Sequence, residues 1–98
     1  MIVVRDVFQL HFGQARAAIA ALKDLSVVES AAGYRVTRLL SDVTGPYYTL
    51  VSESEFGSLS ELEAALAAMG SDDRWRESYS RFAALVREGR REVFRVVA

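Results

Sequence analysis

The sequence lacks cysteine altogether and contains one proline and one histidine among its 98 residues. Without cysteine the chain forms no disulfide, no thiolate nucleophile and no thiolate metal site, and this composition agrees with a reducing cytoplasm. Since His11 is the single histidine, there is no second imidazole for a zinc site. We therefore expect a cytoplasmic protein without a metal or other cofactor.

An excess of charge of one sign is lacking as well. Twelve Lys and Arg residues are balanced by thirteen Asp and Glu residues, for a formal net charge of -1. Such a surface has no field to attract nucleic acid or an anionic membrane, so we expect neither as a partner. No apolar run approaches the ~18 to 20 residues of a membrane span, and the N-terminus shows no basic leader before an apolar run. These absences predict a soluble protein without a targeting segment.

Complete catalytic and nucleotide-binding motifs are also absent. Gly13 and Gly45 lie in predicted turns, and no glycine-rich loop joins a strand to a helix with a following Lys and Ser or Thr. The residues alone leave open whether the protein is an enzyme.

Apolar surface, in contrast, is abundant. Hydrophobic residues make up 51% of a chain whose length fits one domain, residues 1–98. A domain of this size has little interior in which to bury them. Self-association is one way of covering the surplus.

Alternation with a period of two predicts a first strand from residue 2 to residue 12. Its apolar face, which we expect under helices, carries Ile2, Val4, Phe8, Leu10 and Phe12, and its opposite face carries Val3, Arg5, Val7, Gln9 and His11. Apolar spacings of three and four then predict an amphipathic helix over residues 14–30. Residues 34–40 and 47–56 predict two strands of a hairpin, with a turn between them.

The second half of the chain predicts a broken helix and a last strand. Ser58 and Glu61 form a capping box at a helix start. The helix is interrupted near Gly70 and continues from Trp75 with Gly89 as its terminator. A final strand is expected over residues 91–97.

The resulting order, βαββαβ, is that of a ferredoxin-like α+β fold, with a four-stranded antiparallel sheet and the helices on one face. The first and third strands are then central. The sheet face away from the helices carries apolar residues such as Val3 and Val7 and would be solvated in a monomer. Burying ~600 Å² of apolar surface is worth on the order of 15 kcal/mol before the costs of association, so we expect two sheets to pair in a homodimer.

Five segments resemble a known family. They are Val4 to Phe8, Phe12 to Ala15, Asp42 to Val51, Trp75 to Phe82 and Gly89 to Phe94. Here the sequence is similar to a small bacterial NIPSNAP-type protein of the dimeric α+β barrel superfamily. The resemblance implies a homodimer whose two sheets form a barrel, with a cleft in each protomer between sheet and helices. The superfamily includes cofactor-free oxygenases, haem-degrading enzymes, lactone isomerases and members of no known activity, so it selects no chemistry.

The single histidine is a candidate catalytic residue. His11 could act as a general base, a haem ligand or a pH-sensitive group, because an imidazole titrates near neutrality. A lone histidine at the end of a central strand is more often a hydrogen-bonded structural residue. Both interpretations stay open.

Aromatic residues are candidates for the cleft walls. Trp75, Tyr79 and Phe82 form a stripe at helical spacing, which fits a cleft wall and fits plain core packing better. Tyr47 and Tyr48 are adjacent on a predicted strand, so we expect them on opposite faces of the sheet.

Charged residues cluster near the last strand. The arginines there are Arg87, Arg90, Arg91 and Arg95, with Arg5 expected on a neighbouring strand. They could hold a carboxylate or phosphate by bidentate contacts. Ion pairs with Glu53, Glu55, Glu88 and Glu92 are the favoured alternative because the charges nearly balance. Asp72 and Asp73 at a helix start fit dipole compensation better than a catalytic acid pair.

We predict a dimeric NIPSNAP-like protein that binds a small apolar or aromatic metabolite in the cleft between sheet and helices. Its polar contacts would come from Arg5, Gln9 and His11, and its walls from Tyr48, Trp75 and Tyr79. One alternative is a cofactor-independent monooxygenase or isomerase with His11 as proton acceptor. Another is a structural or interaction dimer without a ligand.

Overall fold

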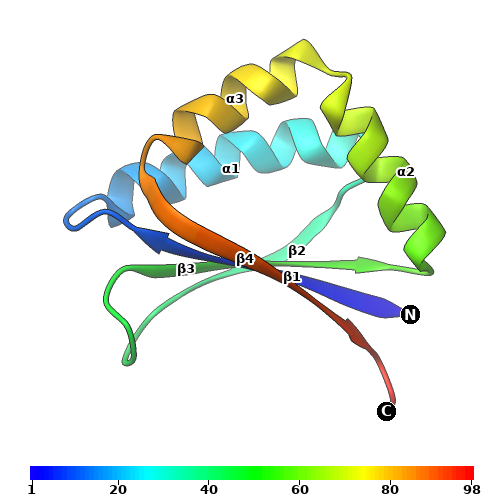
Figure 1. Cartoon of the computed structure of the whole chain (residues 1–98), viewed down its shortest axis with the longest axis horizontal. Coiled ribbons are helices and arrows are strands. Elements are labelled where there is room, and N and C mark those ends of the chain that lie inside the picture. The colour runs from blue at the N-terminus through cyan, green and yellow to red at the C-terminus, as the bar shows by residue number, and fades with distance from the viewer.

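The computed structural model describes all of residues 1–98 as one α+β unit (Figure 1). Its elements are β1 (Ile2–Leu10), α1 (Ala15–Ala31), β2 (Val36–Ser41), β3 (Thr49–Phe56), α2 (Leu59–Gly70), α3 (Asp73–Ala83) and β4 (Val86–Arg95). The predicted βαββαβ order, with its second helix in two pieces, is confirmed. None of the three helices is long and apolar enough to cross a membrane.

The four strands form one antiparallel sheet in the order β2-β3-β1-β4. β1 and β3 are therefore central, as predicted. Figure 1 shows the helices arching over one face of this sheet, with α1 and α3 side by side, while no element covers the other face. We call the covered side the helix face and the uncovered side the outer face.

Two apolar clusters fill the space between the helix face and the helices. One contains Val4, Tyr34, Phe56, Leu62, Ala65 and Met69. The other contains Leu10, Ala18, Leu22, Leu25, Leu50 and Phe82. On β1 the polar residue Asp6 lies between Val4 and Leu10 on this same face, so the apolar packing is interrupted near the middle of the sheet.

Local capping interactions set the starts of α2 and α3. The Glu61 N–H donates to Ser58 Oγ at 3.3 Å, which confirms the predicted cap, and the Glu61 carboxylate accepts from the Gly57 N–H at 2.8 Å. Asp72 caps α3 by accepting from the Arg74 N–H at 2.8 Å. This satisfies a backbone donor that would otherwise be free at the helix start.

The first strand is shorter than predicted, and the placement of Phe12 under the helices is wrong. β1 ends at Leu10, because the His11 N–H donates to the Leu85 carbonyl and Gly13 turns the chain toward α1 at φ 80°. Phe12 is exposed and its ring lies 5.1 Å from that of Tyr48.

The last strand is longer than predicted, and Gly89 does not terminate a helix. It lies inside β4 opposite Phe8, because β1 offers β4 a pairing partner from Leu10 back to Ile2. A Cβ on Gly89 would lie 3.1 Å from the Phe8 ring, so glycine leaves room for that ring. Tyr47 and Tyr48 also differ from expectation: both precede β3, and Tyr48 has a φ of 58° rather than strand geometry.

Candidate functional site

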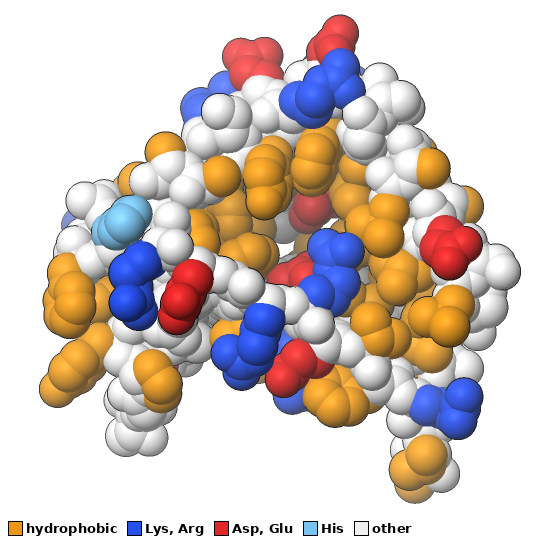
Figure 2. Space-filling model, in the orientation of Figure 1, with side chains coloured by type: hydrophobic (Ala, Val, Ile, Leu, Met, Phe, Trp, Pro, Cys, Tyr) orange, Lys and Arg blue, Asp and Glu red, His pale blue; other side chains and the backbone are white.

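A cleft of about 430 Å³ lies between the sheet, α1 and α3. Figure 2 shows this hollow beneath the helical arch, with hydrophobic side chains along its walls and acidic side chains in its depth. Its apolar lining includes Phe8, Leu22, Leu25, Phe82 and Val86, and its polar lining includes Asp6, Glu29, Ser52, Tyr79, Arg87, Glu88, Arg90 and Arg91. The cleft occupies the region where Asp6 interrupts the apolar packing.

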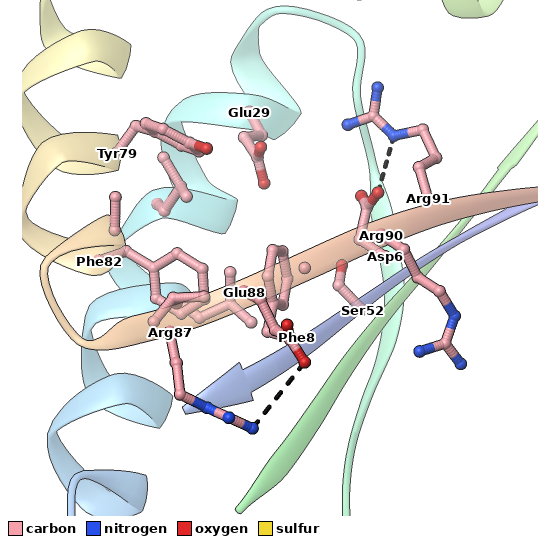
Figure 3. Close-up of a pocket in the computed structure, with 15 residues that line it drawn as sticks. Asp6, Phe8, Glu29, Ser52, Tyr79, Phe82, Arg87, Glu88, Arg90 and Arg91 are labelled. Atoms are coloured by element: carbon pink, nitrogen blue, oxygen red, sulfur yellow. Dashed lines mark hydrogen bonds and ion pairs between the residues drawn. The ribbon is translucent and has the colours of Figure 1, made fainter. Parts of the chain in front are cut away.

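Asp6 is held by two donors from distant parts of the chain. Its Oδ2 accepts from the Tyr34 hydroxyl at 2.8 Å, and its Oδ1 accepts from Arg91 Nε at 2.7 Å. Asp6 and Arg91 are opposite each other in the pairing of β1 with β4, so strand register brings them together. Figure 3 shows this pair at one side of the cleft. Charge-assisted bonds of this length are stronger than neutral ones.

The surroundings of Asp6 keep Tyr34 neutral and Arg91 charged. Burial, together with the nearby Asp6 carboxylate, raises the pKa of Tyr34 above its usual value. Burial disfavours the charge on Arg91, but the hydrogen bond that Arg91 donates to Asp6, together with the negative charges nearby, outweighs burial and raises the Arg91 pKa. The cluster therefore holds a neutral phenol, which donates to Asp6, and a guanidinium that balances its charge.

Glu29 is a second buried carboxyl in the cleft, and it has no ionic partner. It lies on α1 with 9% of its surface exposed, and its Oε2 accepts from Trp75 Nε1 at 3.3 Å. Its Oε1 accepts no hydrogen bond from the protein and is open to the cleft. Burial is the main reason that the pKa of Glu29 is raised to about 7, and the nearby charge of Asp6 adds to this effect.

Aromatic rings line the cleft or lie beside it. Trp75 and Tyr79 are stacked with ring centroids 4.8 Å apart, and Phe8 meets Phe82 edge to face at 4.9 Å. Figure 3 shows the Tyr79 hydroxyl turned toward Glu29, with Phe8 and Phe82 on the opposite side of the cleft. The result is an apolar slot that ends at a carboxyl group able to gain or lose a proton near neutrality.

The arginines around the cleft already have carboxylate partners. Arg91 pairs with Asp6 at 2.7 Å, Arg90 with Glu92 at 3.4 Å, and Arg87 with Glu88 at 3.8 Å. Of the four predicted carboxylate partners, Glu88 and Glu92 form ion pairs here and Glu53 forms one with Arg5, whereas Glu55 forms none. Arg91 pairs with Asp6, which was not anticipated. These contacts leave little basic charge free for an anion.

The structure does not bring the predicted site residues together. Tyr79 lines the cleft. Trp75 is not part of the lining, but its indole N–H donates a hydrogen bond to Glu29, which is. Arg5 and Gln9 lie on the outer face, where Arg5 pairs with Glu53 at 2.8 Å and Gln9 donates to Thr49 Oγ1 at 2.9 Å.

The two remaining predicted residues lie at one end of the molecule. His11 is exposed in the turn after β1 and lines none of the three described pockets. Tyr48 lines a separate surface pocket beside Phe12.

The most prominent polar residues of the cleft, Asp6 and Glu29, were missed by sequence reasoning, although both leave a signal. Asp6 is in phase with the apolar face of β1, and Glu29 continues the stripe of Ala18, Leu22 and Leu25 along α1. A charged residue at a position expected to be buried indicates a buried ion pair or a functional site. The contribution of Arg91 has no local signal, because it depends on strand register.

The outer face carries its own ion cluster. Glu53 is 4% exposed and accepts from Arg5 Nε at 2.9 Å and Arg38 Nε at 2.7 Å. Both bonds hold the pKa of Glu53 below its usual value, and the bond from Arg38 has the larger effect. Arg5 also lies over the Phe94 ring, 5.4 Å from its centroid, and Phe94 is 47% exposed.

The overall geometry is a ferredoxin-like α+β fold, and comparison with solved structures agrees. The chain is similar to an uncharacterised NIPSNAP domain protein from Burkholderia xenovorans, with a TM-score of 0.90, 13% identity, and coverage of 100% of this chain and 96% of that one. A NIPSNAP family protein of unknown function from Agrobacterium tumefaciens gives a TM-score of 0.88 at 17% identity, covering 96% and 86% of the two chains.

A named oxygenase shares the fold as well. SnoaB, a cofactor-independent oxygenase from Streptomyces nogalater, gives a TM-score of 0.77 at 13% identity, covering 99% of this chain and 93% of that one. No family model and no curated protein matches the sequence. The predicted resemblance to NIPSNAP proteins is therefore confirmed as a likeness of fold, which by itself assigns no activity.

Proposed function

We propose that this NIPSNAP-like protein binds a compact apolar or aromatic metabolite in the cleft between the sheet, α1 and α3. The observation that carries the proposal is the combination of apolar walls with a polar, buried end in a cleft of about 430 Å³. Small-molecule sites are of this size, and they combine mostly apolar linings with a few placed polar groups. In this structure the polar groups are Glu29, Asp6 and Ser52, rather than Arg5, Gln9 and His11.

Filling the cleft tests the proposal. Ala83 lines the cleft and its neighbour Ala84 is exposed outside it, so Ala83→Phe and Ala84→Phe add the same ring to the two sides of one helix end. Binding of small aromatic compounds is measured by ligand-observed NMR and thermal shift. We expect Ala83→Phe to abolish binding and Ala84→Phe to retain it. Equal binding by both variants, or no binding by the unaltered protein, contradicts the proposal and favours a dimer without a ligand.

We also propose that the protein forms a homodimer through its outer face. This face is uncovered, and it places the half-exposed Phe94 beside an ion cluster in which Glu53 is already paired with Arg5 and Arg38. Pairing two such faces removes apolar surface from water without leaving Glu53 unpaired. Sedimentation at micromolar concentration is expected to give a dimer that Phe94→Asp dissociates. Val27→Asp, at an exposed position on α1, is the matched control, and a monomeric unaltered protein contradicts the proposal.

An enzyme of the cofactor-independent monooxygenase or isomerase type is the second candidate. The observation that favours it is the near-neutral pKa of Glu29 in the cleft, which suits a proton acceptor. Under this proposal Glu29→Gln lowers kcat at least about 100-fold, within the range usual for a lost general base, while His11→Ala leaves it unchanged. Loss of turnover in His11→Ala alone contradicts the role of Glu29.

A further inference from the structure

Glu29 is the one carboxylate of the cleft lining without a cationic partner. Asp6 pairs with Arg91 and Glu88 pairs with Arg87, whereas Glu29 receives a single hydrogen bond, from the neutral indole of Trp75. Its second oxygen is open to the cleft. A buried charge without a partner is costly, and the cost falls when a ligand supplies the missing positive charge.

The walls around Glu29 suit a cation that carries an apolar body. Tyr79 presents a ring stacked on Trp75, and Phe8 and Phe82 lie across the cleft. Aromatic faces attract ammonium groups, most strongly where water is excluded. The slot thus offers a carboxylate to pair with a positive charge. Its aromatic rings can contact both that charge and the carbon skeleton attached to it.

Other ligand charges fit the cleft less well. An anionic ligand would be repelled by ionised Glu29 and would compete with Asp6 for Arg91, or with Glu88 and Glu92 for the exposed Arg87 and Arg90. A neutral ligand would leave Glu29 either uncompensated or protonated. A cation meets neither difficulty.

We propose that the cleft recognises a protonated amine on a compact apolar or aromatic skeleton, with the ammonium group donating to Glu29 Oε1. This assignment rests on the proposed ligand-binding function and names its substrate class. The skeleton lies against Phe8, Phe82 and Leu22, and Tyr79 closes the slot on the α3 side.

Binding of such an amine is linked to a proton. The titratable groups that face Glu29 are Asp6 on β1, Tyr34 before β2, Tyr79 on α3 and Arg91 on β4. Since the pKa of Glu29 is about 7, the free site is mostly protonated at pH 6 and mostly ionised at pH 8. Amine affinity therefore rises about tenfold over this interval, with proton release on binding at the lower pH.

Calorimetry with three matched ligands tests the proposal: naphthylmethylamine, naphthylmethanol and naphthoate, all substituted at the same ring position. We expect the amine to bind at least about tenfold more tightly than the other two at pH 8. Glu29→Gln, which keeps an acceptor for Trp75, is expected to remove this preference and its pH dependence. Glu63→Gln, on the exposed side of α2, is the charge-matched control and is expected to change neither.

The outcomes separate this inference from the proposed function. Preference for the alcohol or the naphthoate overturns the amine assignment but leaves the cleft as a binding site. An amine preference that survives in Glu29→Gln overturns the role of Glu29. Failure of all three ligands to bind the unaltered protein, with Ala83→Phe indistinguishable from it, overturns the proposed function itself. The pH series on the unaltered protein gives a result that needs no variant to fold.

Discussion

The two faces of the sheet each hold a carboxylate against arginine, but they do so in different surroundings. Asp6 on the helix face lies under helices and joins Tyr34 and Arg91. Glu53 on the outer face is 4% exposed and pairs with Arg5 and Arg38 on a side of the sheet that no helix covers. We expect the two clusters to carry different weights, because helices cover Asp6 and Tyr34, whereas Arg38, one of the two partners of Glu53, has a side chain that is 64% exposed.

The two faces are expected to differ most in the stability that is lost when a phenylalanine is replaced by alanine. Phe56 on β3 is 6% exposed in the first apolar cluster, whereas Phe94 on β4 is about half exposed on the outer face. We expect Phe56→Ala to lower the free energy of unfolding by about 3 to 5 kcal/mol, and Phe94→Ala by less than about 1 kcal/mol in the monomer. Urea denaturation measures both. A comparable loss from Phe94→Ala that grows with protein concentration would show that a second copy covers the outer face.

Removing the charge of Glu29 from the cleft is expected to have the next largest effect on the free energy of unfolding, and this effect is stabilising. The pKa of Glu29 is about 7 in the folded protein against 4.5 unfolded, so its contribution to stability is full below 4.5 and is lost as pH rises to about 7. At pH 8 we expect Glu29→Gln to raise the free energy of unfolding by about 2 to 3 kcal/mol, and at pH 4 to change it little. Denaturation at both pH values checks this. A pH-independent effect, or one matched by Glu63→Gln, would contradict it.

Breaking the two ion clusters compares the faces most directly. Asp6→Asn leaves Arg91 without its counter-charge, and because the Arg91 side chain is 42% exposed we expect a loss of about 2 kcal/mol rather than the full cost of a buried pair. Glu53→Gln is expected to cost at most about 1 kcal/mol in the monomer. The pKa of Glu53 is depressed, so its contribution is present at neutral pH and is lost as pH falls below the usual carboxylate range. Unfolding curves that rank the two variants in reverse would refute this comparison.

Most of the fold was predictable because its signals are local. The alternation in β1, the apolar stripe of α1 and the cap at Ser58 depend on neighbouring residues, and all three are present in the structure. The errors fall at element ends. Phe12 leaves the strand and Gly89 joins one, since the extent of β1 and β4 depends on what each can pair with.

The candidate site was predictable only in part. Tyr79 was placed on a cleft wall, and Asp6 and Glu29 were visible as charged residues in buried positions of their elements. Their grouping was not visible, because no spacing along the chain relates a residue of β1 to one of α1. The expected polar contacts Arg5 and Gln9 belong to the face of β1 opposite the helices, whereas the cleft lies on the helix face, to which Asp6 belongs.

By itself the sequence determined the order of strands and helices, the side of each that is apolar, and the balanced charge. These properties depend on residues a few positions apart and on composition. Only the tertiary structure decided that Asp6 meets Arg91, 85 positions away, and that Glu29 meets Trp75, 46 positions away. The reason is that strand register and helix packing, rather than local preference, determine which side chains share a cleft and which charge in it is left without a partner.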